Sequence, residues 1–138
     1  MPALVVDASV VLAWGLPDEI SPYADAVLSV VEWEGLRVPE IWAREIANGL
    51  AIASIRKRIT SADEQKFLAA MSRLTIASEA SFPLTIIRDG TASAIRFGLT
   101  AYDAAYVDLA LREQLRLATL DVQMRKAAEQ AGVIIFSG

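Results

Sequence analysis

Four acidic residues interrupt apolar stretches of this 138-residue sequence and are its first candidates for chemistry. Asp7 ends the apolar run ALVV, and Asp121 follows the run LATL. Glu45 and Asp103 lie within apolar helical patterns, each on a face shared with mostly apolar residues. A carboxylate on such a face loses hydration, so it must be paired, protonated or bound to a cation. The four acids therefore need a common explanation.

The predicted elements can bring these acids together. Asp7 and Asp121 both come at the carboxyl end of a predicted strand, where sites form in open α/β sheets. If Glu45 and Asp103 project inward from flanking helices, four carboxylates converge and repel one another unless protonated or metal-bound. We therefore expect the four acids to bind Mg²⁺ or Mn²⁺, in the kind of site that supports phosphodiester cleavage.

Each acid also has a purely structural interpretation. An aspartate between a strand and a helix is a favoured N-cap, worth about 1 kcal/mol, and this applies to Asp7 and Asp121. Asp103 lies three residues after Thr100 and can complete a capping box. Both interpretations stay open for these three residues. Capping does not explain Glu45, because it lies in the middle of a predicted helix.

Alternating strand and helix patterns run along the chain and predict its fold class. The pattern predicts strands over 3–6, 36–38, 117–120 and 133–136, and helices over 8–15, 22–34, 40–58, 61–74 and 122–131, with further helices ending near 97 and spanning 100–115. Between 75 and 91 we expect a loop that holds one short strand, either TIAS or LTII. This alternation predicts one α/β domain over residues 1–138, with a central, mainly parallel sheet flanked by helices on both faces.

Composition excludes several classes of chemistry. Cysteine and histidine are absent, which removes disulfides, thiol nucleophiles, the usual zinc sites and imidazole catalysis. The formal charge of −4 counts against nucleic-acid binding, although bound divalent cations would offset an acidic cluster. No apolar run approaches the roughly 18 residues of a membrane span, and no signal peptide is recognisable. We therefore expect a cytoplasmic protein without a membrane partner.

The sequence resembles the PIN-domain family, and in particular its VapC-type toxins. The matching stretches are VVDASVVLAW, VPEIWAREIANGL, LTAYDAAYVDLAL and LATLDVQMRKAAEQAGV, in the order and spacing of the family. The resemblance covers essentially the whole chain. It implies a Mg²⁺- or Mn²⁺-dependent endoribonuclease, usually a homodimer, that is inhibited by a cognate VapB-type antitoxin.

Carried over by position, the acidic residues of the family fall on Asp7, Glu45, Asp103 and Asp121. The resemblance further implies supporting roles for Asn48 and Thr119. Basic residues that could hold RNA phosphates, or be solvated cations at helix ends, are Arg56, Lys57, Arg58, Arg125 and Lys126. One departure from the family is that Val122 and Gln123 stand where relatives often carry basic residues. Whether this turn binds the substrate is therefore an open question.

Two other α/β enzyme classes fit the sequence less well. A phosphoacceptor receiver domain needs a second acid beside the first and a late lysine, but Ala8 follows Asp7 and no lysine lies near LATL. A haloacid-dehalogenase-type phosphatase needs an aspartate two residues after the first, where Ser9 stands. The remaining alternative is a catalytically silent PIN-like module that binds RNA or protein.

Overall fold

The computed structural model describes residues 3–138 as alternating strands and helices. The strands are β1 (Leu4–Val6), β2 (Leu36–Val38), β3 (Ile76–Ser78) and β4 (Leu117–Ala118). The helices are α1 (Ala8–Gly15), α2 (Pro22–Glu34), α3 (Trp42–Ile55), α4 (Ser61–Met71), α5 (Pro83–Phe97), α6 (Ala101–Glu113) and α7 (Val122–Gln130). In the part of the chain that the structure describes, no helix is both long and apolar enough to cross a membrane.

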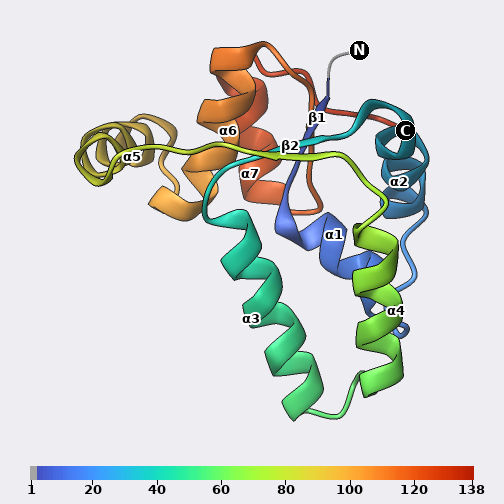
Figure 1. Ribbon diagram of the computed structural model, residues 1–138. Coiled ribbons are helices and arrows are strands. Elements are labelled where there is room, and N and C mark those ends of the chain that lie inside the picture. The colour runs from blue at the N-terminus through green and yellow to red at the C-terminus, as the bar shows by residue number, and fades with distance from the viewer. Residues whose placement is uncertain (1–2) are drawn as a thin grey trace.

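The strands form one parallel sheet in the order β3-β2-β1-β4. β1 is central and fully buried, and Figure 1 shows α2 on one side of it and α6 and α7 on the other. This arrangement confirms the predicted fold class. Because all four strands run the same way, the residues that follow β1 and β4 lie at the same edge of the sheet.

Helices α3 and α4 extend away from the sheet as a two-helix arm (Figure 1). The buried residues of α3 recur along one face of the helix: they are Trp42, Ile46, Leu50 and Ala53. Gly49 allows this helix to come close to α1, since a Cβ atom at that position would lie 2.5 Å from Cδ1 of Leu12. The first turns of α3 are thereby held next to the edge of the sheet that carries Asp7.

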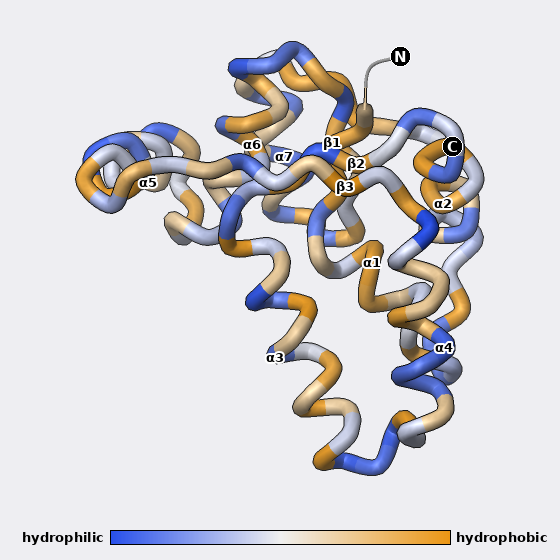
Figure 2. The backbone as a smooth tube through the Cα atoms, viewed as in Figure 1, coloured by the Kyte–Doolittle hydropathy of each residue, from blue (hydrophilic) through white to orange (hydrophobic). Residues whose placement is uncertain are grey.

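Helix α5 is the largest departure from the sequence prediction. The strand in this region is at Ile76–Ser78, so TIAS and not LTII is the strand, and LTII belongs to a helix that begins at Pro83. No residue of α5 is buried, and Figure 2 shows hydrophobic stretches on it, away from β1. Its β-branched residues favour a strand locally, but packing against α6 favours the helix.

Three boundaries also differ from the prediction. α3 ends at Ile55 and α4 at Met71, each three residues earlier than the pattern indicates. The predicted last strand over 133–136 is only an isolated bridge between Ile135 and Leu117. Helix α7 leaves only a short segment beyond Gly132, and Tyr23 holds that segment by donating a 2.7 Å hydrogen bond to the carbonyl of Phe136.

Candidate active site

The carboxyl ends of β1 and β4 are joined through the side chain of Thr119. This residue is fully buried, and its Oγ1 donates a 2.6 Å hydrogen bond to Oδ2 of Asp7. The same oxygen accepts a hydrogen bond of 3.0 Å from the backbone N–H of Asp121. Thr119 thus joins two of the predicted acids, and the supporting role that the resemblance implied for it stays a prediction.

Asp7 and Asp121 are also helix caps. Asp7 accepts a hydrogen bond of 3.3 Å from the backbone of Ser9, and Asp121 accepts one of 3.0 Å from the backbone of Met124. The structural interpretation therefore holds for both residues. It does not exclude a second role, because the cap bond of Asp121 uses only Oδ1 and leaves Oδ2 without a partner among the described residues.

Ser9 is a site residue that the sequence analysis missed. Its Oγ donates a 2.7 Å hydrogen bond to Oδ2 of Asp7, the oxygen that Thr119 also contacts. It also accepts a 3.3 Å hydrogen bond from the backbone of Leu120, which lies beyond β4. Its position in the sequence, two residues after an aspartate that begins a helix, is the signal that could have identified it.

Glu45 meets Tyr106 across the space between α3 and α6. The Tyr106 hydroxyl donates a 2.6 Å hydrogen bond to Oε1 of Glu45, and the Tyr106 side chain is fully buried. Within residues 3–138, Oε2 of Glu45 has no hydrogen-bond partner. Tyr106 is a second site residue that the sequence analysis did not name.

Asp103 lies in the first turn of α6, after the N-cap residue Thr100. The Thr100 hydroxyl accepts a 3.1 Å hydrogen bond from the Asp103 backbone N–H, but a return bond from the Thr100 backbone N–H to the Asp103 carboxylate is not among the hydrogen bonds of the described residues. Both halves of such a box do form at Thr60 and Asp63. The capping box that the sequence suggested for Asp103 is therefore incomplete, and its site role stays a prediction.

The acids interact electrostatically. Burial raises the pKa of Glu45, and the charges of Asp7 and Asp103 raise it further. Burial likewise raises the pKa of Asp103, with added effects from Asp121 and Asp7. No lysine or arginine contributes to either shift. The structure thus brings the four predicted acids close enough to feel one another's charge, from β1, α3, α6 and α7.

The donor set fits a hard divalent cation in its chemistry. All four side chains offer carboxylate oxygens, the ligands that Mg²⁺ and Mn²⁺ prefer. As the side chains lie, however, no three acidic groups within residues 3–138 are close enough to hold an ion together. Hydrogen bonds hold both oxygens of Asp7 and one oxygen each of Glu45 and Asp121 towards protein partners. Binding a cation would therefore need side-chain rotations, and at Asp7 also the exchange of a hydrogen bond.

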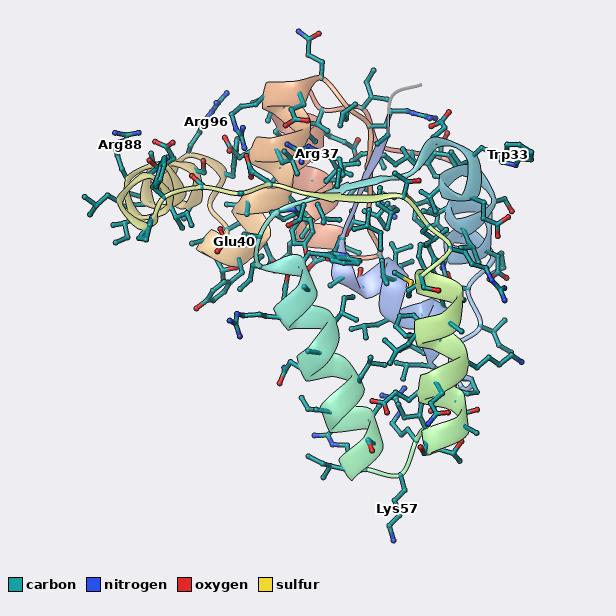
Figure 3. The ribbon with its side chains drawn as sticks, in the orientation of Figure 1. Trp33, Arg37, Glu40, Lys57, Arg88 and Arg96 are labelled. Atoms are coloured by element: carbon teal, nitrogen blue, oxygen red, sulfur yellow. The ribbon has the colours of Figure 1, made fainter. Side chains whose placement is uncertain are left out.

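The basic candidates fall into two groups. Arg56, Lys57 and Arg58 lie in the turn after α3, and Figure 3 shows Lys57 at the far tip of the arm. Arg58 is paired there with Asp18 through two hydrogen bonds of 2.9 Å. These three residues are thus not brought to the acids.

Arg125 and Lys126 lie in the first turns of α7, next to Asp121. Arg125 donates a 3.4 Å hydrogen bond to the carbonyl of Thr119, and its buried Nε has no partner in the described chain. Asn48 lies on α3 with an exposed side chain, one turn beyond Glu45, and its predicted supporting role stays a prediction.

Comparison with known proteins gives the family. Residues 4–130 match the family model described as PIN domain, and the chain therefore belongs to this family. Its relatives include ribonuclease VapC3 of Pyrobaculum aerophilum, which is 32% identical over 88% of this chain and 91% of the relative. Ribonuclease VapC9 of Mycobacterium tuberculosis is 33% identical over 88% of this chain and 87% of the relative. The chain is thus a PIN-domain protein of the VapC type.

Solved structures give the same fold. The crystal structure of PAE2754 from Pyrobaculum aerophilum superimposes with a TM-score of 0.71 and covers 97% of this chain and 89% of that chain. Its sequence identity is 22%, so the likeness concerns the fold alone.

Proposed function

We propose that this protein is a metal-dependent endoribonuclease and the toxin of a toxin–antitoxin pair. The observation that supports this most is the convergence of Asp7, Glu45, Asp103 and Asp121 with no opposing cation. Burial raises the pKa of Glu45 and of Asp103, and the charged neighbours that add to each shift are all acidic. Membership of the PIN family and relatives named ribonucleases support the choice of substrate.

In this proposal the four acids hold Mg²⁺ or Mn²⁺. When bound, the ion supplies positive charge that lowers the pKa of a water molecule and stabilises charge on the phosphodiester in the transition state. Asp7 and Asp121 are held in place by Thr119, and Asp103 by the start of α6. Tyr106 fixes Oε1 of Glu45, so Oε2 orients the attacking water. In-line attack leaves a 5′-phosphate and a 3′-hydroxyl, without any need for the 2′-hydroxyl.

The direct test is cleavage of RNA by the purified protein with Mn²⁺, compared with the Asp7→Asn variant. The proposal expects cleavage that requires the metal and disappears in the variant. Equal cleavage by both proteins would show a contaminating nuclease. No cleavage by either would favour the alternative, a catalytically silent module that binds RNA or protein.

We further propose Arg125 and Lys126, rather than the basic residues at the tip of the arm, as the cations that hold RNA phosphates. Arg125 and Lys126 lie on α7, the helix that Asp121 caps, whereas Lys57 lies beyond the end of α3, at the tip of the arm (Figure 3). Lys126→Ala should weaken RNA binding in metal-free buffer more than Lys57→Ala does, and the reverse order would refute the assignment.

We also propose a homodimer and a VapB-type antitoxin as partners, both acting in the cytoplasm. Leu84, Ile87 and Ile95 recur on one side of α5 and are exposed, with Leu84 at 79% and Ile95 at 78%. A second copy covering these residues would remove an apolar patch from water. Ile95→Asp should therefore convert a dimer to a monomer in analytical ultracentrifugation. A short reading frame beside the gene that encodes a DNA-binding protein, and co-purification of its product, would test the antitoxin.

A further inference from the structure

A cavity of about 520 Å³ opens beside the acidic site, between the start of α3, α5 and α6. This volume is in the range of pockets that take small organic ligands, roughly 300–1,000 Å³. Its walls are mainly apolar, with Ile41 from the turn before α3, Ile86 from α5 and Tyr102 from α6. Three polar side chains matter for its chemistry, and these are Glu40, Arg44 and Asp108.

None of the four acids lines the cavity, but two of its lining residues are immediate sequence neighbours of acids. Arg44 precedes Glu45 on α3, and Tyr102 precedes Asp103 on α6, and both Arg44 and Tyr102 line the cavity. The two helices that carry acids on one side therefore carry cavity residues on another. The acids and the cavity are thus linked through α3 and α6, which is the relationship on which the proposal below depends.

Two of the charged groups in the cavity remain unpaired. Arg112 forms ion pairs with Glu79 and Asp108, and Asp89 pairs with Arg88 at 3.0 Å. Within residues 3–138, Arg44 and Glu40 take part in no ion pair and in no side-chain hydrogen bond. One cation and one carboxylate thus remain available to a ligand.

Tyr102 is the aromatic wall of the cavity. Its side chain is 60% exposed, although it lies beside apolar residues. Single-stranded RNA is held by stacking of its bases on such side chains, by arginine contacts to its phosphates and by hydrogen bonds to the base edges. A carboxylate such as Glu40 accepts hydrogen bonds from the amino groups of cytosine, adenine and guanine, whereas O4 of uracil offers no donor there.

We propose that this cavity binds one nucleobase of single-stranded RNA, on the nucleotide next to the phosphate that is cleaved. Tyr102 stacks on the base, Arg44 contacts a flanking phosphate, and Glu40 accepts a hydrogen bond from the amino group of the base. The proposal rests on the proposed ribonuclease function and adds to it the residues that select the cleavage position.

The proposed dimer surface meets this cavity at Ile87, which lines the cavity and also belongs to the exposed apolar side of α5. By the helical period of about 100° per residue, Ile86 and Ser93 point to the opposite side of α5 from Leu84 and Ile95. Ile86 and Ser93 line the cavity, whereas Leu84 and Ile95 belong to the exposed apolar side. Of the three residues of the proposed dimer surface, Ile87 alone lines the cavity, so a second copy would meet the cavity at that residue.

The first test compares Tyr102→Ala, Tyr102→Phe and Trp33→Ala. Trp33 is a matched control, because it is 87% exposed and lies on α2, far from α5 (Figure 3). For a short single-stranded RNA cleaved with Mn²⁺, we expect Tyr102→Ala to raise KM about tenfold with a smaller change in kcat, by loss of stacking. Tyr102→Phe should keep the KM of the unchanged protein, and so should Trp33→Ala. A KM unaffected by Tyr102→Ala would overturn the proposal.

The second test addresses the polar contacts. Arg44→Ala should raise KM severalfold, whereas Lys57→Ala, which removes an exposed cation at the tip of the arm, should not. Glu40→Gln should shift the preferred cleavage positions on a mixed-sequence RNA, because an amide can donate as well as accept. If Glu40→Gln leaves the cleavage map unchanged, Glu40 does not contact the base. If Arg44→Ala and Lys57→Ala have equal effects on KM, Arg44 does not contact the flanking phosphate.

A binding measurement separates this proposal from the ribonuclease function. Fluorescence anisotropy of labelled oligonucleotides in metal-free buffer needs no cleavage. Weaker binding by Tyr102→Ala than by Trp33→Ala supports the cavity even if no preparation cleaves RNA, an outcome that would refute only the nuclease. Cleavage by the unchanged protein together with equal RNA affinity of both variants would refute the cavity and leave the nuclease standing. Such a result would point to a protein partner as its occupant.

Discussion

Tyr106 and Glu45 meet at 2.6 Å, hydroxyl to carboxylate, although 61 residues separate them in the sequence. The phenol is buried and has the carboxylate as its hydrogen-bond partner, and burial together with this bond raises the pKa of Tyr106 far above its ordinary range. Tyr106 therefore keeps its proton where a free tyrosine would lose it, and it can donate to the Glu45 carboxylate. It holds one oxygen of Glu45 and leaves the other free.

Tyr106→Phe removes this donor and keeps the buried ring. Without it, Glu45 loses its orientation, and we expect affinity for Mn²⁺ and RNA cleavage to fall about 10- to 100-fold, as for other residues that orient metal ligands. Titration calorimetry with Mn²⁺ alone measures the first effect. The matched control is Tyr23→Phe, which removes a similar 2.7 Å hydrogen bond, to the carbonyl of Phe136. Equal Mn²⁺ affinity in both variants would contradict the positioning role of Tyr106.

Asp103→Asn should abolish cleavage, by more than about 100-fold, because it removes a proposed metal ligand. In metal-free buffer the free energy of unfolding should stay unchanged or increase, since the substitution relieves repulsion from Asp121 and Asp7. Urea unfolding measures this free energy. The control is Asp63→Asn, which breaks the complete capping box of α4 and should lower stability while sparing cleavage. A clear loss of stability in Asp103→Asn would instead favour a capping role.

The raised pKa values of Glu45 and Asp103 predict the direction of a pH effect. Between the ordinary carboxyl pKa, near pH 4, and the raised values, the folded metal-free protein binds more protons than the unfolded chain. Its stability should therefore fall as pH rises through this window. Urea unfolding in EDTA at several pH values tests this, with the variant Glu45→Gln/Asp103→Asn expected to show a flatter profile.

With Mn²⁺ present the trend should reverse over the same pH window. The metal competes with protons for the carboxylates, so the stabilisation that it adds should grow as Glu45 and Asp103 lose their protons. The checking measurement is the difference in the free energy of unfolding with Mn²⁺ and with EDTA. If that difference does not depend on pH, these two carboxylates do not bind the ion.

Thr119→Val keeps the shape of a buried side chain but removes its hydroxyl. Asp7 loses its 2.6 Å hydrogen bond and the Asp121 N–H loses its acceptor, which should cost about 1–3 kcal/mol of stability. Cleavage should fall as well, because both acids lose a restraint. Thr119→Ser retains the hydroxyl and should restore cleavage most of the way. If Thr119→Ser is as inactive as Thr119→Val, the methyl group rather than the hydrogen bonds is what matters.

Elements whose caps join neighbouring residues carry local signals in the sequence. The capping box of Thr60 and Asp63 joins residues three apart, and Ser21 caps α2 in the same way. The end of helix α5 near residue 97 was predicted, but its beginning at Pro83 could not be predicted from such signals. Thr85, Ile86 and Ile87 favour a strand, and Gly90 weakens a helix, so its conformation depends on packing against α6.

The four acids could be predicted from the sequence more readily than the residues that hydrogen-bond to them. Asp7 and Asp121 could be predicted because the end of a strand is visible in the hydrophobic pattern. Their link through Thr119 joins residues 112 apart, and nothing in the spacing indicates that its hydroxyl turns towards Asp7. The resemblance alone suggested Thr119, and neither approach suggested Tyr106. Hydrogen bonds between distant segments are fixed by the packing of whole elements and become readable only in three dimensions.

The contact of Gly49 with Leu12 has a mechanical consequence for Glu45. A methyl group added at position 49 would lie 2.5 and 2.7 Å from the two methyl groups of Leu12. At these distances Leu12 or one of the helices α1 and α3 would have to shift. Glu45 lies one turn before Gly49 on α3, so a shift of this helix would move the Glu45 carboxylate away from Tyr106 on α6. The position of the Glu45 carboxylate therefore depends on the absence of a side chain at Gly49.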